Sequence, residues 1–386
     1  MNVVQRVDAL VEAPVLVFGQ PPPHGRDLDL LVRPTDMKAL ADGLEAAGFT
    51  RHGKRFVSFH ECSADVVEVV PADDWGLPGA EVEELFGAAH PLAGAAKVLE
   101  PAPAHALLIL ARRGYLKPKA RVRAASILAS DATALTEARR RAPVWGVAPE
   151  LEALAEGRPP RPRRIGRPRR GTLVTLSGLD GAGKSSQAAA LRDALERVGY
   201  HPVVVWTSLS QHPPLLHAIT RVARWLLGPR RPDGRGEADP GRALRERSRL
   251  VTFAWSAVVA LTNAMEQARA VAPHLWRGRV VICDRYTLDS KVHLRYAYGE
   301  ERGFGFQAAL IGHLSPRPDV AYLLDVSPET ASTRKRDYPL EENARRGNLY
   351  LEEAEGLGVR RLDGERPREE ICAQLAGEVW DFLAAR

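Results

Sequence analysis

Residues 178–185 contain glycines, a lysine and a serine at the spacing of a phosphate-binding loop. The stretch Gly-Leu-Asp-Gly-Ala-Gly-Lys-Ser completes the pattern G-x-x-x-x-G-K-[S/T]. The glycines let consecutive backbone N–H groups converge on a phosphate, Lys184 adds a mobile cation, and Ser185 offers an oxygen to Mg²⁺. The chain is therefore expected to bind a nucleoside triphosphate such as ATP. The predicted contacts are Gly178, Asp180, Gly181, Ala182, Gly183, Lys184, Ser185 and Ser186.

The segments on either side of this loop must hold it in place. Residues 173–176 form a short apolar run, which predicts a buried strand, and residues 187–198 carry apolar side chains on one face, which predicts a helix. A strand, a glycine loop and a helix thus follow one another. The loop then lies at the positive end of the helix, where an anion binds best.

Further apolar runs and helical patterns alternate from residue 202 to the C-terminus. Strands are predicted at 202–206, 279–283, 320–324 and 359–362, and helical stretches at 215–227, 243–275 and 369–383. This alternation predicts an α/β fold with a parallel sheet flanked by helices. Asp284 and Asp325 follow two of these strands, and a carboxylate at the carboxyl end of such a strand can face the phosphates and hold Mg²⁺.

Three motifs in this half of the chain resemble the thymidylate kinases, a branch of the P-loop nucleoside monophosphate kinases. They are residues 178–187, residues 281–290 and residues 317–329 leading to Arg334, and their order and spacing match over some 215 residues from about residue 172. The resemblance implies an ATP-dependent kinase that uses Mg²⁺ and phosphorylates a nucleoside monophosphate, with thymidine monophosphate (dTMP) as the first choice.

The same resemblance assigns roles to individual residues. Asp180, Arg285 and Tyr286 would meet the acceptor, and Ser185 and Asp284 would hold Mg²⁺. A phosphoryl group in transfer spreads negative charge over its oxygens, so the reaction needs positioning and cations more than a nucleophilic side chain. Lys184, Asp284, Arg285 and Arg334 would accordingly form the catalytic set. Closure of a lid would also exclude water, and its cations would be Arg334, Arg336, Arg345 and Arg346.

Three departures from the family pattern lie on the acceptor side. Residues 207–211 read Thr-Ser-Leu-Ser-Gln where the family usually shows Arg-Glu-Pro-Gly, and residues 253–260 are apolar where relatives carry Asp-Arg followed by histidine. Ser177 stands where many relatives have glutamate. Two alternatives therefore remain open: a kinase of a different metabolite or sugar, with an apolar face around Trp255 at its acceptor site, or a nucleotide-gated binding module without turnover.

The N-terminal 150 residues carry a second acidic pattern. A strand over 14–19 ends in Gly19, a strand over 27–32 carries Asp27 and Asp29 on one face, and a later strand over 65–71 adds Asp65 or Glu68. The pattern, with helical segments over 104–113 and 117–129, resembles the nucleotidyltransferase superfamily. It implies an α+β domain with a metal site, although Gln20 replaces the expected serine. The domain would be an active transferase or a degenerate binding or scaffolding domain.

Charge and composition divide the chain into these two domains. The formal charge is +6, yet residues 157–170 contain seven arginines and no acid, so removing them leaves −1. We predict domains over 1–150 and 171–386 joined by an extended linker over 151–170, and a mobile loop over 229–241. Because the basicity is concentrated in the linker, we do not expect nucleic acid as a partner.

Cysteine usage and the apolar runs bear on location and assembly. The three cysteines are far apart, which argues against a disulfide framework and a zinc site. Neither an export signal nor a membrane span is indicated, so we expect a cytoplasmic protein that binds ATP and a small phosphorylated acceptor. The apolar stretch 250–261 could join two copies in a homodimer or belong to the core.

Overall fold

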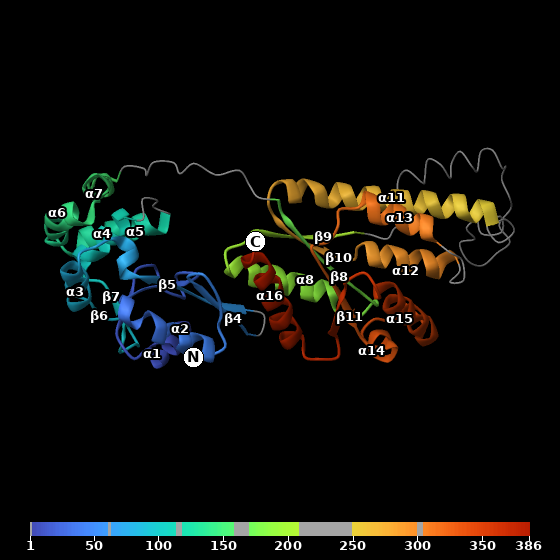
Figure 1. The fold of residues 1–386 in the computed structure, drawn as a ribbon, viewed down its shortest axis with the longest axis horizontal. Coiled ribbons are helices and arrows are strands. Elements are labelled where there is room, and N and C mark those ends of the chain that lie inside the picture. Colours follow the sequence, from blue (N-terminus) through green and yellow to red (C-terminus); the bar gives the residue numbers. More distant parts are fainter. Residues whose placement is uncertain (1, 61–62, 113–117, 158–169, 208–248, 299–303) are drawn as a thin grey trace. The chain divides into compact units, whose positions relative to one another are not determined.

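The chain divides into two compact units. In a computed structural model, which describes residues 2–60, 63–112, 118–157, 170–207, 249–298 and 304–386, the division falls between residues 167 and 168. Each unit has its own sheet and its own helices (Figure 1). None of the described helices is both long and apolar enough to cross a bilayer.

The C-terminal unit is built on a five-stranded sheet whose described pairings are all parallel. Its order is β12-β11-β8-β10-β9, so the strand that leads into the glycine loop, β8, is the central one. This confirms the predicted α/β fold with a parallel sheet. The strands are β8 Thr172–Gly178, β9 Pro202–Trp206, β10 Val280–Asp284, β11 Val320–Asp325 and β12 Arg360–Asp363.

Helices pack on both sides of this sheet (Figure 1). The first of them buries Ala188, Leu191, Ala194 and Leu195, which are the side chains that the sequence pattern placed on its inner face. The predicted helical stretch 215–227 and the predicted loop 229–241 lie outside the described residues. The described helices are α8 Lys184–Arg197, α11 Arg249–Trp276, α12 Thr287–Tyr298, α13 Gly305–Leu314, α14 Pro328–Arg334, α15 Leu340–Ala354 and α16 Arg368–Ala384.

The N-terminal unit has a seven-stranded mixed sheet in the order β3-β4-β5-β2-β1-β7-β6. Its second strand pairs antiparallel with β1 and parallel with β5, which brings the two acidic strands side by side. The strands are β1 Val15–Val17, β2 Leu28–Val32, β3 Thr50–His52, β4 Arg55–His60, β5 Ser63–Pro71, β6 His90–Pro91 and β7 Val98–Glu100.

Two hydrophobic clusters hold this unit together. One packs the first two helices on the sheet, and the other joins the sheet to the later helices around the fully buried Trp145. The helices are α1 Val3–Leu10, α2 Met37–Ala46, α3 Gly79–Gly87, α4 Pro103–Arg112, α5 Pro118–Ser130, α6 Ala134–Trp145 and α7 Ala148–Ala155.

The boundary of the N-terminal unit differs from the predicted position. Helix α7 continues to Ala155, whereas the linker was predicted to begin at residue 151. Leu151 and Leu154 lie on one face of this helix and are buried in the cluster around Trp145, so the segment is part of the folded unit. Most of the remaining predicted linker, residues 158–169, lies outside the described residues.

Candidate active site

The phosphate loop joins the end of β8 to the start of α8, as the sequence predicted. Gly178 ends the strand, residues 179–183 form the turn, and Lys184 begins the helix. Gly181 and Gly183 have φ angles of 91° and 92°, a region that favours glycine. A Cβ atom on Gly181 would lie 2.5 Å from the carbonyl oxygen of Ala331. Glycine is therefore required at position 181 for two reasons: the backbone angle, and the close approach of the α14 backbone at Ala331.

Lys184 is buried and turned back over its own loop. Its Nζ donates hydrogen bonds to the carbonyl oxygens of Gly178 at 2.8 Å and Leu179 at 2.7 Å. Burial lowers the pKa of Lys184, and the nearby carboxylates of Asp289 and Asp284 act in the opposite direction. The ammonium is thus held at the mouth of the loop by carbonyl groups that a phosphate oxygen could replace.

Ser185 and Asp284 meet although 99 residues separate them. The Ser185 hydroxyl donates a hydrogen bond to Asp284 Oδ2, because Asp284 ends β10 and β10 lies beside β8. The other carboxylate oxygen, Oδ1, is buried and has no hydrogen-bond partner. Burial raises the pKa of Asp284, opposed by the Ser185 hydrogen bond and by Lys184. A hydroxyl and a carboxylate whose second oxygen is buried and unbonded together form a donor set that fits Mg²⁺.

Two arginines converge on one carboxylate at the other side of the loop. Arg285 donates a hydrogen bond to Asp180 Oδ1, and Arg346 Nη1 lies 3.4 Å from Asp180 Oδ2. Arg285 has a φ angle of 71°, a conformation that is costly for a non-glycine residue and that is found most often at functional sites. Its backbone is held by Leu176, whose carbonyl accepts from Arg285 N at 3.0 Å, and by Thr207, whose hydroxyl donates to Arg285 O at 2.5 Å.

The backbone next to Arg285 is supported by a buried carboxylate that the motif analysis did not single out. Asp289 accepts hydrogen bonds from the Ser177 hydroxyl at 2.6 Å, the Tyr286 backbone N–H at 3.0 Å and the Tyr350 hydroxyl at 2.8 Å. Ser177, which departs from the glutamate of many relatives, is therefore the partner of an acid that comes from α12. The signal that could have found it is the acid three residues after Asp-Arg-Tyr.

Tyr286 was predicted to meet the acceptor, but its hydroxyl is used within the fold. The side chain is buried, and its hydroxyl donates to the carbonyl oxygen of Pro316 at 2.8 Å. Burial raises the pKa of this phenol. Tyr286 can accordingly position Arg285, its neighbour in the chain, by anchoring the turn.

The four predicted lid arginines have different surroundings. Arg346 is buried, packs over the ring of Tyr338 at 4.3 Å and reaches Asp180. Arg345 is exposed and lies over the ring of Tyr296 at 5.7 Å. The other two are also exposed: Arg334 donates to the carbonyl oxygen of Gly364 at 3.3 Å, and Arg336 lies just beyond the end of α14.

Asp325, the second aspartate at a strand end, has a different neighbour from Asp284. Its carboxylate accepts from Arg361 Nη2 at 2.5 Å, because β11 pairs with β12 and Arg361 lies on that neighbouring strand. The ion pair is partly exposed. Asp284, by contrast, is buried beside the phosphate loop. The two strand-end acids therefore have different surroundings.

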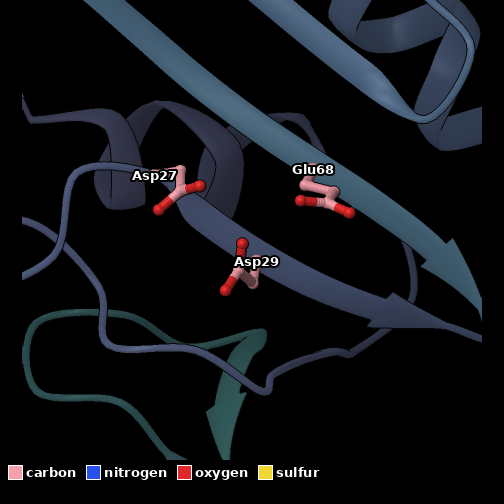
Figure 2. A group of neighbouring side chains, drawn as sticks. All are labelled: Asp27, Asp29 and Glu68. Carbon is pink, nitrogen blue, oxygen red and sulfur yellow. The ribbon is translucent and has the colours of Figure 1, made fainter. Parts of the chain in front are cut away.

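Three acids meet in the N-terminal unit. Oxygen atoms of Asp27, Asp29 and Glu68 all lie within 4.8 Å of one another (Figure 2). Asp29 on β2 and Glu68 on β5 are direct partners in the parallel register. A Cβ on Gly19 would lie 2.1 Å from Asp29 Oδ2, so this approach requires glycine. Such a cluster could hold a divalent cation.

Asp65, the other candidate for the third acid, is not in this cluster. Asp65 and Glu68 are three residues apart on β5, so their side chains point to opposite faces of the sheet. Asp65 instead pairs with Arg6 at 2.5 Å and with His60 at 3.2 Å. Of the two alternatives that the sequence left open, Glu68 is the one that lies with Asp27 and Asp29.

A central parallel strand, a glycine loop and a strand-end carboxylate on the neighbouring strand define the C-terminal unit as a P-loop phosphotransferase. No family model matches the chain. The chain is 32% identical over 228 residues to the thymidylate kinase of Bordetella petrii, covering 54% of this chain and 95% of that protein. It is 30% identical over 227 residues to the thymidylate kinase of Ruegeria pomeroyi, covering 55% of this chain and 96% of that one. The chain belongs to the thymidylate kinase family.

Proposed function

We propose that the C-terminal unit transfers the γ-phosphoryl group of ATP to dTMP in the presence of Mg²⁺ and releases ADP and thymidine diphosphate. The observation that carries the proposal is the pairing of Ser185 with Asp284 beside the buried ammonium of Lys184. It combines a metal-type donor set with a cation at the mouth of one phosphate loop. Family membership supports dTMP as the acceptor.

On the ATP side, the loop backbone and the N-terminus of α8 would bind the phosphates. Lys184 Nζ would exchange the carbonyl oxygens of Gly178 and Leu179 for phosphate oxygens. Ser185 and Asp284 would hold Mg²⁺, which supplies charge neutralisation at the β- and γ-phosphates. The loop runs directly into the helix, whose first residue is Lys184, so the phosphates would be aligned by adjacent parts of the chain.

On the acceptor side, Arg285 and Arg346 would bind the phosphate of the nucleoside monophosphate. Their shared contact with Asp180 keeps both guanidinium groups directed toward the loop. A monophosphate oxygen is largely ionised at neutral pH, so the attacking group needs no general base. Alignment and cations therefore suffice for the reaction.

Two strand-end acids provide a matched test of this function. ADP release from ATP and Mg²⁺ should require dTMP and should fall about a hundredfold in Asp284→Asn, which loses a metal ligand. Asp325→Asn removes an equivalent acid that pairs with Arg361 on the next strand and should retain activity within about twofold of wild type. Equal losses in both variants would contradict the assigned role of Asp284.

The same assay separates the two alternatives. A kinase of another metabolite or sugar would bind ATP and release ADP only with that acceptor, and not with dTMP. A nucleotide-gated binding module would bind ATP and release no ADP with any acceptor. Turnover that depends on dTMP excludes both.

We propose as a second, separate site that Asp27, Asp29 and Glu68 bind a divalent cation such as Mg²⁺. The observation that favours it is the approach of the three acids to within 4.8 Å of one another. In a titration with Mn²⁺ and no nucleotide, the Asp27→Asn/Asp29→Asn double variant should bind about one Mn²⁺ per chain fewer than wild type. Asp65→Asn should bind as much Mn²⁺ as wild type. Kinase turnover of the double variant should stay within about twofold of wild type if the units act independently. Unchanged Mn²⁺ binding in the double variant would refute the site.

The remaining partner assignments are proposals with simple tests. We propose that the protein acts in the cytoplasm on small molecules rather than on nucleic acid. The two described cysteines, Cys283 and Cys372, are both buried. On α11, Phe253, Leu261 and Met265 are exposed apolar side chains that support self-association into a homodimer. A molar mass from light scattering equal to one chain would exclude the dimer.

A further inference from the structure

Within the described part of the kinase unit, one buried side chain has two polar atoms and no hydrogen bond from either. Asn263, in the middle of α11, is 1% exposed, and neither its Nδ2 nor its Oδ1 has a partner. Of the residues that the structure describes, only His105 in the other unit shares this property of two unbonded buried polar atoms. A dry unbonded amide destabilises a folded protein, so its presence calls for a bonding partner outside the chain.

Two polar residues on the same face of α11 are fully used by the fold. Ser256, seven residues before Asn263, accepts from Gln307 Nε2 at 2.9 Å and donates to the carbonyl oxygen of Phe253. Gln267, four residues after it, donates to Ser290 and accepts from Ser315, both at 2.8 Å. The fold therefore satisfies the polar groups on either side of Asn263 and leaves the middle one without a partner.

The neighbours of Asn263 on α11 contact the first turns of α12, so Asn263 lies beside these turns. Ala260 lies in one apolar cluster with Leu294, and Gln267 bonds Ser290, which is one helical turn before Leu294. Asn263 lies between Ala260 and Gln267 on the same face of α11, so its amide faces this turn of α12. The backbone N–H of Ser290 in turn donates to the carbonyl oxygen of Tyr286, next to Arg285.

A histidine on this turn of α12 is close to the acceptor-side cations. Burial, together with the positive charges of Arg346 and Arg285, lowers the pKa of His293 to about 4. This turn of α12 is therefore within electrostatic reach of both guanidinium groups. An acceptor whose phosphate binds those groups can extend its base toward Asn263.

We propose that Asn263 is a specificity-determining residue that reads the base of the acceptor nucleotide; this rests on the proposed function. An amide presents one donor and one acceptor side by side, and the imide edge of thymine presents the complementary pair. Asn263 Nδ2 donates to the thymine O4 carbonyl, and Oδ1 accepts from thymine N3–H. A site built to hydrogen-bond a substrate group discriminates strongly against an analogue that lacks it.

The test combines a variant with a modified substrate. Asn263→Ala removes the amide, and N3-methyl-dTMP removes the N–H that the amide would accept. Wild-type KM should rise at least about tenfold on N3-methylation. In Asn263→Ala the KM for dTMP should rise by a similar factor, the methyl group should add nothing further, and the KM for ATP should not change. Thr262→Val, whose hydroxyl bonds only helix carbonyls, should keep the wild-type discrimination.

The possible results separate the two proposals. If wild type turns over dTMP and Asn263→Ala keeps the full penalty for N3-methylation, Asn263 does not contact the base and only this inference fails. If wild type neither turns over dTMP nor binds it in calorimetry, the proposed function fails with it.

A second measurement distinguishes recognition from a structural role. Asn263→Leu replaces an unbonded amide by an apolar group of similar size, so Tm without ligand should rise by about 2–4 °C while dTMP affinity falls. A fall in Tm together with unchanged dTMP affinity would assign Asn263 to the core and overturn the proposal.

Discussion

Acidic side chains come together in both units, but with different companions. In the C-terminal unit Asp284 lies beside Lys184, and Asp180 lies between Arg285 and Arg346. In the N-terminal unit the cluster consists of three acids, Asp27, Asp29 and Glu68. A mixed group of acids and bases can hold a metal together with its anionic substrate, whereas an acidic group alone is complementary to a cation. The companions of a carboxylate, more than its position on the strand, therefore indicate its ligand.

Removal of the cation from the mixed site of the C-terminal unit should have the largest effect on activity. Lys184→Ala should lower kcat of dTMP-dependent ADP release by about 10³-fold, because the charge of the transferring phosphoryl group loses the cation of the phosphate loop. The measurement is steady-state turnover with ATP, Mg²⁺ and dTMP. Activity within tenfold of wild type would show that the site needs only its metal ligands and not the lysine. It would then resemble the acidic cluster of the N-terminal unit, which is proposed to bind only a metal.

Substitution of the two neighbouring arginines of α15 should have smaller effects on kcat/KM for dTMP, and the two effects should differ. Arg346→Met keeps the packing of the aliphatic stem but removes the guanidinium near Asp180, so kcat/KM for dTMP should fall about ten- to a hundredfold. Arg345→Met should change it less than about threefold, because Arg345 is exposed and contacts a ring. If both variants lose activity equally, the lid cations act as a general positive surface and Arg346 has no individual role.

The smallest effect concerns a buried histidine and the stability of the N-terminal unit. His105 is buried against Trp145 with both ring nitrogens unbonded, and burial lowers its pKa, opposed by Glu81 and Glu137. The unfolded chain then binds a proton more readily than the folded unit. Stability should be unaffected above the ordinary pKa of 6.5 and should fall as the pH drops below it, by at most about 1.4 kcal/mol per pH unit.

Denaturation of the full chain followed by tryptophan fluorescence at pH 7.5 and 5.5 tests this expectation. His105→Leu should remove that part of the pH dependence while leaving the fold intact. A variant that keeps the full wild-type dependence would assign the acid sensitivity to other groups.

The parts of the molecule that the sequence predicted are those set by local pattern. The glycine loop, β8 and α8 follow from residues that are adjacent in the chain. The approach of Asp284 to Ser185 was also predictable, because the carboxyl ends of neighbouring parallel strands meet at one edge of the sheet. The helical character of residues 151–155 was missed, because the Arg/Pro-rich composition that follows them dominated the interpretation.

The parts that escaped prediction depend on packing between distant segments. Asp289 and Tyr350 are 61 residues apart in the chain and meet only when α15 packs on α12. The use of Tyr286 as an anchor for its turn depends on Pro316, 30 residues further along. The choice of Glu68 over Asp65 needed the register and the face of β5, which a short acidic run does not reveal.

The folded-back position of Lys184 has a consequence for the cost of binding. Without a phosphate, its ammonium is held by two carbonyl groups of the loop that it serves, at 2.7 and 2.8 Å. The loop therefore has internal hydrogen bonds of its own, and an arriving phosphate exchanges these bonds rather than ordering a disordered segment. Most of the conformational entropy of the site is lost during folding, so little remains to be lost on substrate binding.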